Sequence, residues 1–81
     1  MPIVLRVKGY RFGFYASDGM EPPHVHVSSG TKNVKFWLVP VVTLEKNQGF
    51  RPFELNEIKR LTDRHRDELL EAWDEFFGDQ N

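Results

Sequence analysis

Two histidines stand two residues apart in the segment EPPHVHVSSG, residues 21–30. Alternate residues of a β-strand point to the same side and lie about 6.5 to 7 Å apart, so His24 and His26 are near enough to flank one reactive group. Because an imidazole titrates near neutral pH, one ring can act as general base while the other acts as general acid. The pair predicts metal-independent, ribonuclease-like cleavage of a phosphodiester bond.

Basic and aromatic residues in the same half of the chain supply the other parts of such a site. Arg11 is expected to be catalytic together with the histidines, since a cation stabilises the charge that develops on phosphorus. Further cations hold phosphates, and aromatic rings stack on bases. The residues expected to bind the RNA substrate are Arg6, Lys8, Tyr15, Lys35 and Trp37.

A metal site is an alternative interpretation of the same motif. His24 and His26 would give two ligands and Glu21 or Asp18 a third, as in a metal-dependent hydrolase. Thiolate ligands are excluded because the chain has no cysteine. The basic neighbours would repel a cation, so the sequence favours a site with no metal and no cofactor. In a third interpretation the histidines are ordinary polar residues on a solvated sheet face.

The elements that must position these residues follow from hydrophobic periodicity. Alternation of apolar and polar residues predicts strands over 3–8, 10–15, 24–28 and 34–38, with a further short strand over 41–44 as an alternative. From Pro52 the period becomes helical, which predicts one long helix over 52–77; a break near Thr62–Asp63 is the alternative. We therefore predict an α+β fold in a single domain, 1–81: an antiparallel sheet of four or five strands with the C-terminal helix packed on one face.

The same alternation assigns side chains to the two faces of the sheet. The face toward the helix is predicted to hold the core residues Ile3, Leu5, Val7, Phe12, Phe14, Val25, Val27, Val34, Phe36 and Leu38. The opposite face is predicted to form one exposed patch of Arg6, Lys8, Arg11, Tyr15, His24, His26, Ser28, Lys35 and Trp37. A large indole on a water-facing surface usually has a partner that covers it, so this patch is the predicted binding surface.

Charge and composition limit the partners and the location. Residues 1–40 hold five basic residues against two acidic ones, whereas residues 41–81 hold six against ten. A basic half is typical of a surface that meets a polyanion, in agreement with RNA as a ligand. The N-terminal apolar run is too short for a signal peptide or a membrane span, so we expect a cytoplasmic protein with no membrane partner. Because a chain of 81 residues is only marginally stable alone, a homodimer or a second protein is a plausible partner.

Three segments carry a recognisable pattern: GYRFGFYASDGMEPPHVHV (9–27), KFWL (35–38) and RHRDELLEAWDEFFG (64–78). Together they resemble a family of small bacterial and archaeal domains of unknown function, with the PPHVHV strand as the most specific element. The family is similar to the toxin component of type II toxin–antitoxin pairs (DhiT type). The resemblance therefore implies a toxin with a small antitoxin-like protein as its cognate partner, and it implies no catalytic residue. A non-catalytic protein-interaction module regulated by such a partner is the alternative function.

Overall fold

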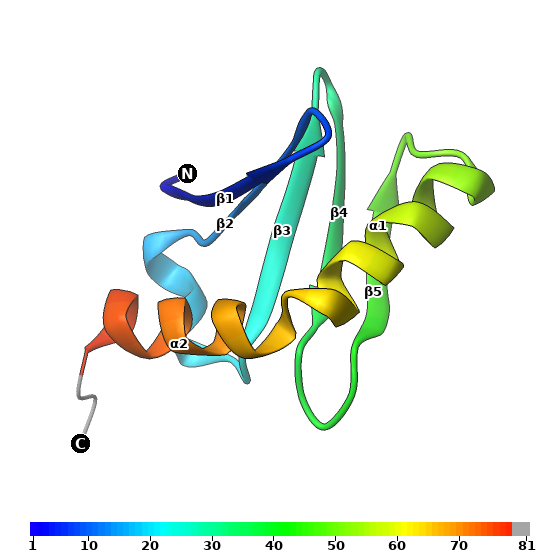
Figure 1. Cartoon of the computed structure of the whole chain (residues 1–81). Helices are drawn as coiled ribbons and strands as arrows, with labels where there is room; N and C mark the ends of the chain where they lie inside the picture. The colour runs from blue at the N-terminus through cyan, green and yellow to red at the C-terminus, as the bar shows by residue number, and fades with distance from the viewer. Residues whose placement is uncertain (79–81) are drawn as a thin grey trace.

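The structure, a computed structural model, describes residues 1–78 and contains a five-stranded antiparallel sheet with two C-terminal helices (Figure 1). The elements in chain order are β1 (Ile3–Val7), β2 (Tyr10–Gly13), the 3-10 helix η1 (Ala16–Met20), β3 (His24–Ser29), β4 (Lys32–Trp37), β5 (Thr43–Gln48), α1 (Pro52–Arg64) and α2 (Arg66–Phe77). The strands lie side by side in chain order, as a meander. The predicted α+β fold is confirmed. No helix within residues 1–78 is long and apolar enough to cross a membrane.

The helical segment is bent, and the bend falls at His65 between α1 and α2. Thr62 donates its hydroxyl to the Ile58 carbonyl at 2.7 Å, a side-chain bond that competes with the backbone ladder and bends helices. One uninterrupted helix over 52–77 is therefore wrong, and the break lies close to the predicted alternative. Arg66 then fixes the start of α2 to the sheet, because its Nε donates to the Leu38 carbonyl at 2.7 Å.

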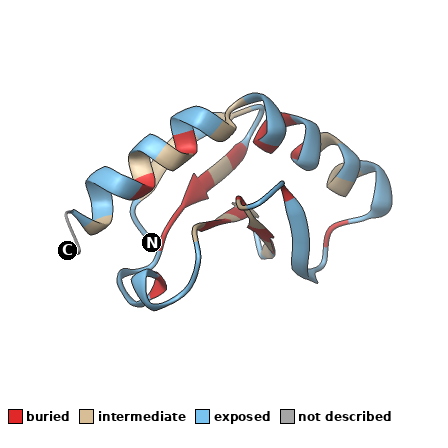
Figure 2. Cartoon of the chain, turned by 90° about the horizontal axis from the view of Figure 1, so that it is seen from below, coloured by how far each residue is buried: buried red, intermediate tan, exposed pale blue. Residues whose placement is uncertain are grey.

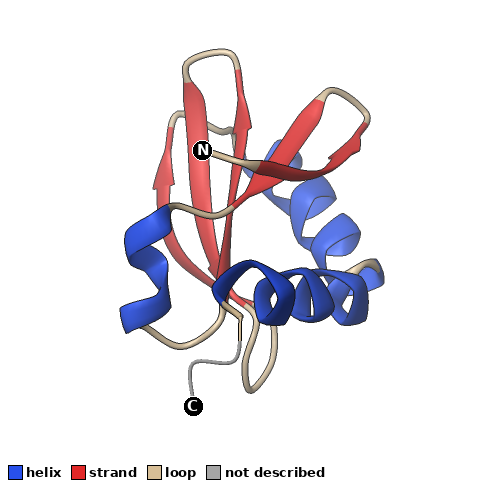
Figure 3. Cartoon of the chain, turned by 90° about the vertical axis from the view of Figure 1, so that its left-hand side faces the viewer, coloured by secondary structure: helices blue, strands red, loops and turns tan. Residues whose placement is uncertain are grey.

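The core lies between the sheet and the two long helices, whereas η1 lies on the other side of the sheet from α1 (Figure 3). Most residues predicted for the core are buried there: Phe12, Phe14, Val25, Val27, Val34, Phe36 and Leu38. Leu5 and Val7 are half-buried and pack against this core. The alternation of the strands thus gave the correct inner face for β2, β3 and β4.

Ile3 does not belong to this core, and its prediction is wrong. A bulge between Ile3 and Leu5 shifts the register of β1 against β2. A bulge adds one residue to a strand and turns the residues before it to the other face. Val4 packs against the core instead, while Ile3 lines a hollow on the opposite side of the sheet.

The fifth strand, β5, runs over Thr43–Gln48 and not over 41–44 as predicted. All six of its residues are exposed, and Figure 2 shows one strand in pale blue along its whole length. Because neither face of β5 is buried, its sequence TLEKNQ has no apolar alternation. The strand forms through its backbone pairing with β4, which the periodicity could not indicate.

Candidate functional site

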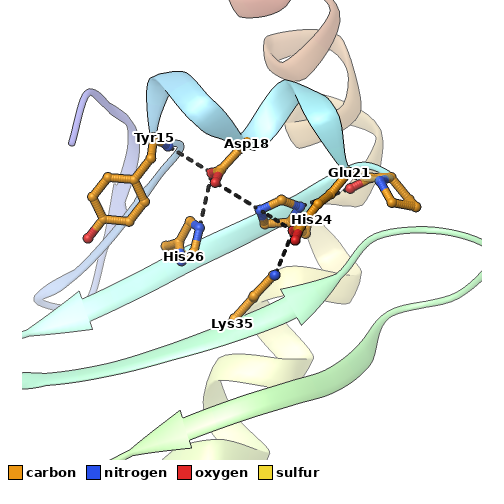
Figure 4. Close-up of polar contacts among 7 residues, drawn as sticks. Tyr15, Asp18, Glu21, His24, His26 and Lys35 are labelled. Carbon is orange, nitrogen blue, oxygen red and sulfur yellow. Dashed lines mark hydrogen bonds and ion pairs between the residues drawn. The ribbon is translucent and has the colours of Figure 1, made fainter.

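An aspartate and two histidines meet at the start of β3 (Figure 4). Asp18 comes from η1, and His24 and His26 alternate on β3. Asp18 Oδ1 lies 3.2 Å from His24 Nε2, and Asp18 Oδ2 lies 3.0 Å from His26 Nε2. The main-chain N–H of Tyr15 donates to Asp18 Oδ2 at 2.8 Å and so holds the carboxylate over the strand. We call Asp18, His24 and His26 the Asp18 cluster.

His24 is fully buried, so its predicted place in an exposed patch is wrong. Its ring contacts the rings of Trp37 on β4 and Trp73 on α2, with centroids 5.4 and 5.2 Å away. Nδ1 lies 2.8 Å from the Pro22 carbonyl oxygen, and since that oxygen only accepts, Nδ1 is the donor. The side chain is on the same face of β3 as His26, but this face is not clear of the helices as predicted. Trp73 of α2 and Asp18 of η1 lie against the ring, and the period of a strand gives no information about such cover.

His26 is half-buried beside Asp18, with the ring of Tyr15 packed edge-on at a centroid distance of 4.6 Å. Burial lowers the pKa of His26, because the charged imidazolium loses its hydration, and the negative charge of Asp18 opposes this effect in part. The Nε2 atoms of both histidines are fully buried, and within residues 1–78 neither completes a hydrogen bond. Their contacts with Asp18 are close but poorly aligned for N–H donation.

Lys35 and Glu21 form a second layer around the Asp18 cluster (Figure 4). Lys35 Nζ donates to Glu21 Oε1 at 2.7 Å, and it lies 4.6 Å from the ring centroid of Trp37. The hydrogen bond from Lys35 is the main reason why the pKa of Glu21 lies below its usual value. Glu21 Oε1 is also 3.7 Å from His24 Nε2. Lys35 and Trp37 are half-buried, and Lys35 contacts both the Trp37 ring and Glu21.

Arg6 and Arg11 lie at the other end of the same sheet face and are directly opposite each other in the β1–β2 register. A hollow of about 390 Å³ opens beside them, lined also by Ile3, Tyr15, Ser28, Lys32 and Asn33. Neither arginine forms an ion pair with a carboxylate of residues 1–78, whereas Lys32 Nζ pairs with Glu54 Oε2 at 2.8 Å. We call this region the arginine hollow.

The structure brings some of the predicted substrate-binding residues together and separates others. Tyr15 lines the arginine hollow and also packs on His26, so it joins the two regions. Lys8 does not belong to this face: it sits in the β1–β2 turn with φ of 52°, and its Nζ is 3.7 Å from Glu57 Oε2 on α1. In a two-residue hairpin this backbone conformation sets the direction of the side chain, which alternation along a strand does not describe.

Comparison with known sequences assigns the family. The sequence pattern of DUF4160, a domain of unknown function, matches residues 9–74. The chain belongs to this family. No curated protein and no solved structure matches it. The matched residues run from the β1–β2 turn into α2, so they include the Asp18 cluster and Arg11 but not Arg6.

Asp18 is the residue of the site that sequence reasoning placed least well. In the sequence SDG it looks like a turn residue, and it stands six positions before His24. Its role depends on η1 folding back over β3, which brings it between the two imidazoles. An acidic residue shortly before an H-x-H strand is the only signal in the sequence, and it supports Asp18 and Glu21 equally.

Proposed function

We propose that this protein binds single-stranded RNA in the arginine hollow and acts as the toxin component of a toxin–antitoxin pair in the cytoplasm. RNA binding is supported chiefly by the pair Arg6 and Arg11. These residues lie opposite each other on the adjacent strands β1 and β2, and neither has a carboxylate partner within residues 1–78. Like charges opposite each other destabilise a sheet. A phosphate between the two guanidinium groups would relieve this repulsion and accept hydrogen bonds from both.

The neighbours of the arginines are those that a nucleotide needs. Tyr15 is 48 % exposed, so its ring has a free area on which a base can stack. Ser28 and Asn33 line the same hollow and add neutral hydrogen-bonding groups. Cations for phosphates next to an aromatic ring are typical of sites for single-stranded nucleic acid.

The toxin role is supported by the resemblance of the PPHVHV segment to toxins of this type. Cleavage of RNA by His24 and His26 is not part of our proposal. A general acid or base must reach the proton that it transfers, and His24 is fully enclosed while the Nε2 of His26 faces Asp18.

The RNA proposal is tested by fluorescence polarisation with a short labelled single-stranded RNA at several salt concentrations. The double variant Arg6→Gln/Arg11→Gln is expected to bind at least about tenfold more weakly, since it loses two phosphate contacts. The slope of log K against log salt is expected to flatten by about 0.7, because the two arginines neutralise one phosphate and each phosphate of a single strand contributes about 0.7.

The matched control is Arg60→Gln/Arg64→Gln, which removes two exposed positive charges from α1. We expect its affinity to change less than about twofold, beyond the general effect of net charge. Equal losses in the two double variants would show that RNA binds through overall charge, and the arginine hollow would then have no specific role.

A second candidate function, a protein-interaction module, is favoured by the outer edge of β5. This strand pairs only with β4 within the described chain, and every residue in it is exposed. Beside it lies an apolar hollow of about 230 Å³ lined by Phe36, Leu44, Pro52 and Leu55, among others. An exposed strand edge next to apolar side chains is a surface on which a partner can add a strand.

In this second case a small antitoxin-like protein would pair with β5. The test is co-purification with the product of the neighbouring open reading frame. Leu44→Asp is expected to abolish the complex, because a carboxylate would enter the apolar hollow. The control Glu45→Gln, at the next residue of the same strand, is expected to leave it intact. A complex that survives Leu44→Asp would place the partner elsewhere.

A further inference from the structure

We infer that the Asp18 cluster is a binding site for a divalent transition metal ion of the zinc class, held by His24 Nε2, His26 Nε2 and the carboxylate of Asp18. The inference is independent of RNA binding in the arginine hollow. It begins from proximity: one ligand atom from each of the three residues lies within 4.8 Å of the others. The three residues come from two elements, η1 and β3, so the folded chain assembles the site.

The spacing of the atoms suits such an ion. Ligand atoms about 2.0 to 2.1 Å from zinc lie roughly 3.3 Å apart in a tetrahedral site. Asp18 Oδ1 lies 3.2 Å from His24 Nε2 and Asp18 Oδ2 lies 3.0 Å from His26 Nε2, so each imidazole is at ligand spacing from a different oxygen, as a carboxylate that binds through both oxygens would offer. Two imidazoles and one carboxylate are ligands that zinc and its neighbours in the transition series prefer, whereas calcium and magnesium prefer oxygen ligands alone.

The hydrogen bonding of His24 supplies an independent argument. Nδ1 donates to the Pro22 carbonyl, so in the neutral ring Nε2 carries a lone pair and no proton, and it lies 3.2 Å from Asp18 Oδ1. Two acceptors then face each other in a fully buried position, and the Nε2 of His26 is also buried without a hydrogen bond. A cation among these atoms satisfies all of them. A backbone carbonyl that holds the second ring nitrogen is the usual support of a metal-bound histidine.

The surroundings complete the site. Glu21 Oε1, 3.7 Å from His24 Nε2, is near enough to provide a fourth ligand, and with Asp18 it would balance the charge of a divalent ion. Lys35 is a cation whose charge acts on His26, and this charge is already paired with Glu21 at 2.7 Å. The indole rings of Trp37 and Trp73 lie against His24, and they limit the access of water that would compete for the ion.

The test uses the full chain, stripped of metal with a chelator and then dialysed. Isothermal titration with Zn²⁺ is expected to show one ion per chain, and the melting temperature is expected to rise by several degrees, because an ion that binds only the folded state stabilises it. Co²⁺ is expected to quench the tryptophan fluorescence, since both indoles contact His24, and to give the visible absorption of a histidine-bound ion.

The decisive variants are His26→Gln and Asp18→Asn, each expected to weaken zinc binding at least about a hundredfold. The matched control is His65→Gln: His65 also lies beside a carboxylate, at 3.1 Å from Glu68, but outside the Asp18 cluster. This control is expected to keep the affinity, the stoichiometry and the quenching. Circular dichroism in chelator checks that each variant is folded.

If a cluster variant does not fold, the wild-type protein alone still tests the inference. The number of zinc ions bound per chain and the quenching of tryptophan fluorescence by Co²⁺ are then the two measurements. A wild-type protein that binds no zinc at micromolar concentration overturns the inference. So does equal loss of zinc binding in His26→Gln and His65→Gln. In either case the Asp18 cluster is a buried polar network only, and the RNA-binding experiment is unaffected.

Discussion

The two ends of one sheet face differ in the burial and the pairing of their charged and polar side chains. At the start of β3, Asp18 and His24 are buried and close to each other. At the β1–β2 end, Arg6 and Arg11 lie beside an open hollow, and neither has a carboxylate partner within residues 1–78. The strand pattern alone makes these two ends look alike.

The difference arises from what covers each end. The Asp18 cluster is enclosed by η1 and by Trp73 of α2, so its groups interact strongly in a low dielectric. The arginine hollow stays hydrated, where repulsion between two cations is weak and salt screens it. A buried polar group is thus tied to the fold, whereas an exposed unpaired cation is available for a ligand.

Removal of the central carboxylate should give the largest effect. Asp18→Ala leaves the main-chain N–H of Tyr15 without its acceptor and leaves a void between two imidazoles. We expect it to lower the free energy of unfolding by about 3 kcal/mol, because an unsatisfied buried donor costs about 1 to 3 kcal/mol and the cavity adds to this cost. Urea unfolding in the presence of a chelator measures this loss without any contribution from metal.

Glu21→Ala is the matched control for Asp18→Ala, because it removes the same charge three residues away from an exposed position. We expect it to change the stability much less than Asp18→Ala does, because solvent screens the charge of an exposed group. If both variants lost the same amount, the proposed contrast between enclosed and open charges would be wrong at this end of the sheet.

A pH experiment tests an enclosed group on the helix side of the sheet. Tyr10 is buried there and donates to Glu57 Oε1 at 2.9 Å. Burial and, after it, this hydrogen bond raise the pKa of Tyr10 from 10.0 to about 12. The folded state therefore keeps a proton that the unfolded chain releases near pH 10. This stabilisation is fully present below pH 10 and is lost as the pH rises to about 12.

The expected loss from Tyr10 over this range is about 2 to 3 kcal/mol, since one unit of pKa corresponds to about 1.4 kcal/mol. Tyr10→Phe is expected to lack this part of the alkaline destabilisation, while the titration of the lysines affects both proteins alike. Urea unfolding of both proteins at about pH 9 and pH 11.5 measures the difference. Equal losses of unfolding free energy in the two proteins would show that the protonated Tyr10 hydroxyl does not stabilise the fold.

The smallest effect is expected at the open end. Arg11→Gln should change the stability by less than about 0.5 kcal/mol, because the side chain is only half-buried and has no carboxylate partner. At low salt the variant should be slightly more stable than the wild type, since it removes the repulsion with Arg6 opposite. Thermal unfolding at low and high salt checks this sign. A large loss at both salt concentrations would show that Arg11 is structural.

Hydrophobic periodicity and local backbone preferences were enough to predict the α+β architecture, the inner face of β2, β3 and β4, and the start of the helical segment. Alternation places Phe12, Val27 and Phe36 on one side because the pleat of a strand fixes this geometry locally. Pro52 begins α1 as predicted, because its fixed φ and missing N–H suit the first helical turn. The same local rule correctly put Arg11, His26 and Lys35 on one face, as the strand register shows.

What covers that face depends on the packing of elements that are distant in sequence. The burial of His24, the place of Asp18 between two imidazoles and the turn of Lys8 toward α1 depend on segments that meet across the fold. The bulge in β1 and the exposed strand β5 likewise depend on pairing with neighbouring strands. A periodic pattern indicates the face of the sheet on which a side chain lies. The burial of that side chain and its electrostatic partners are set by elements distant in sequence. These elements cover one end of the face, where the Asp18 cluster is closed, and leave the arginine hollow open at the other end.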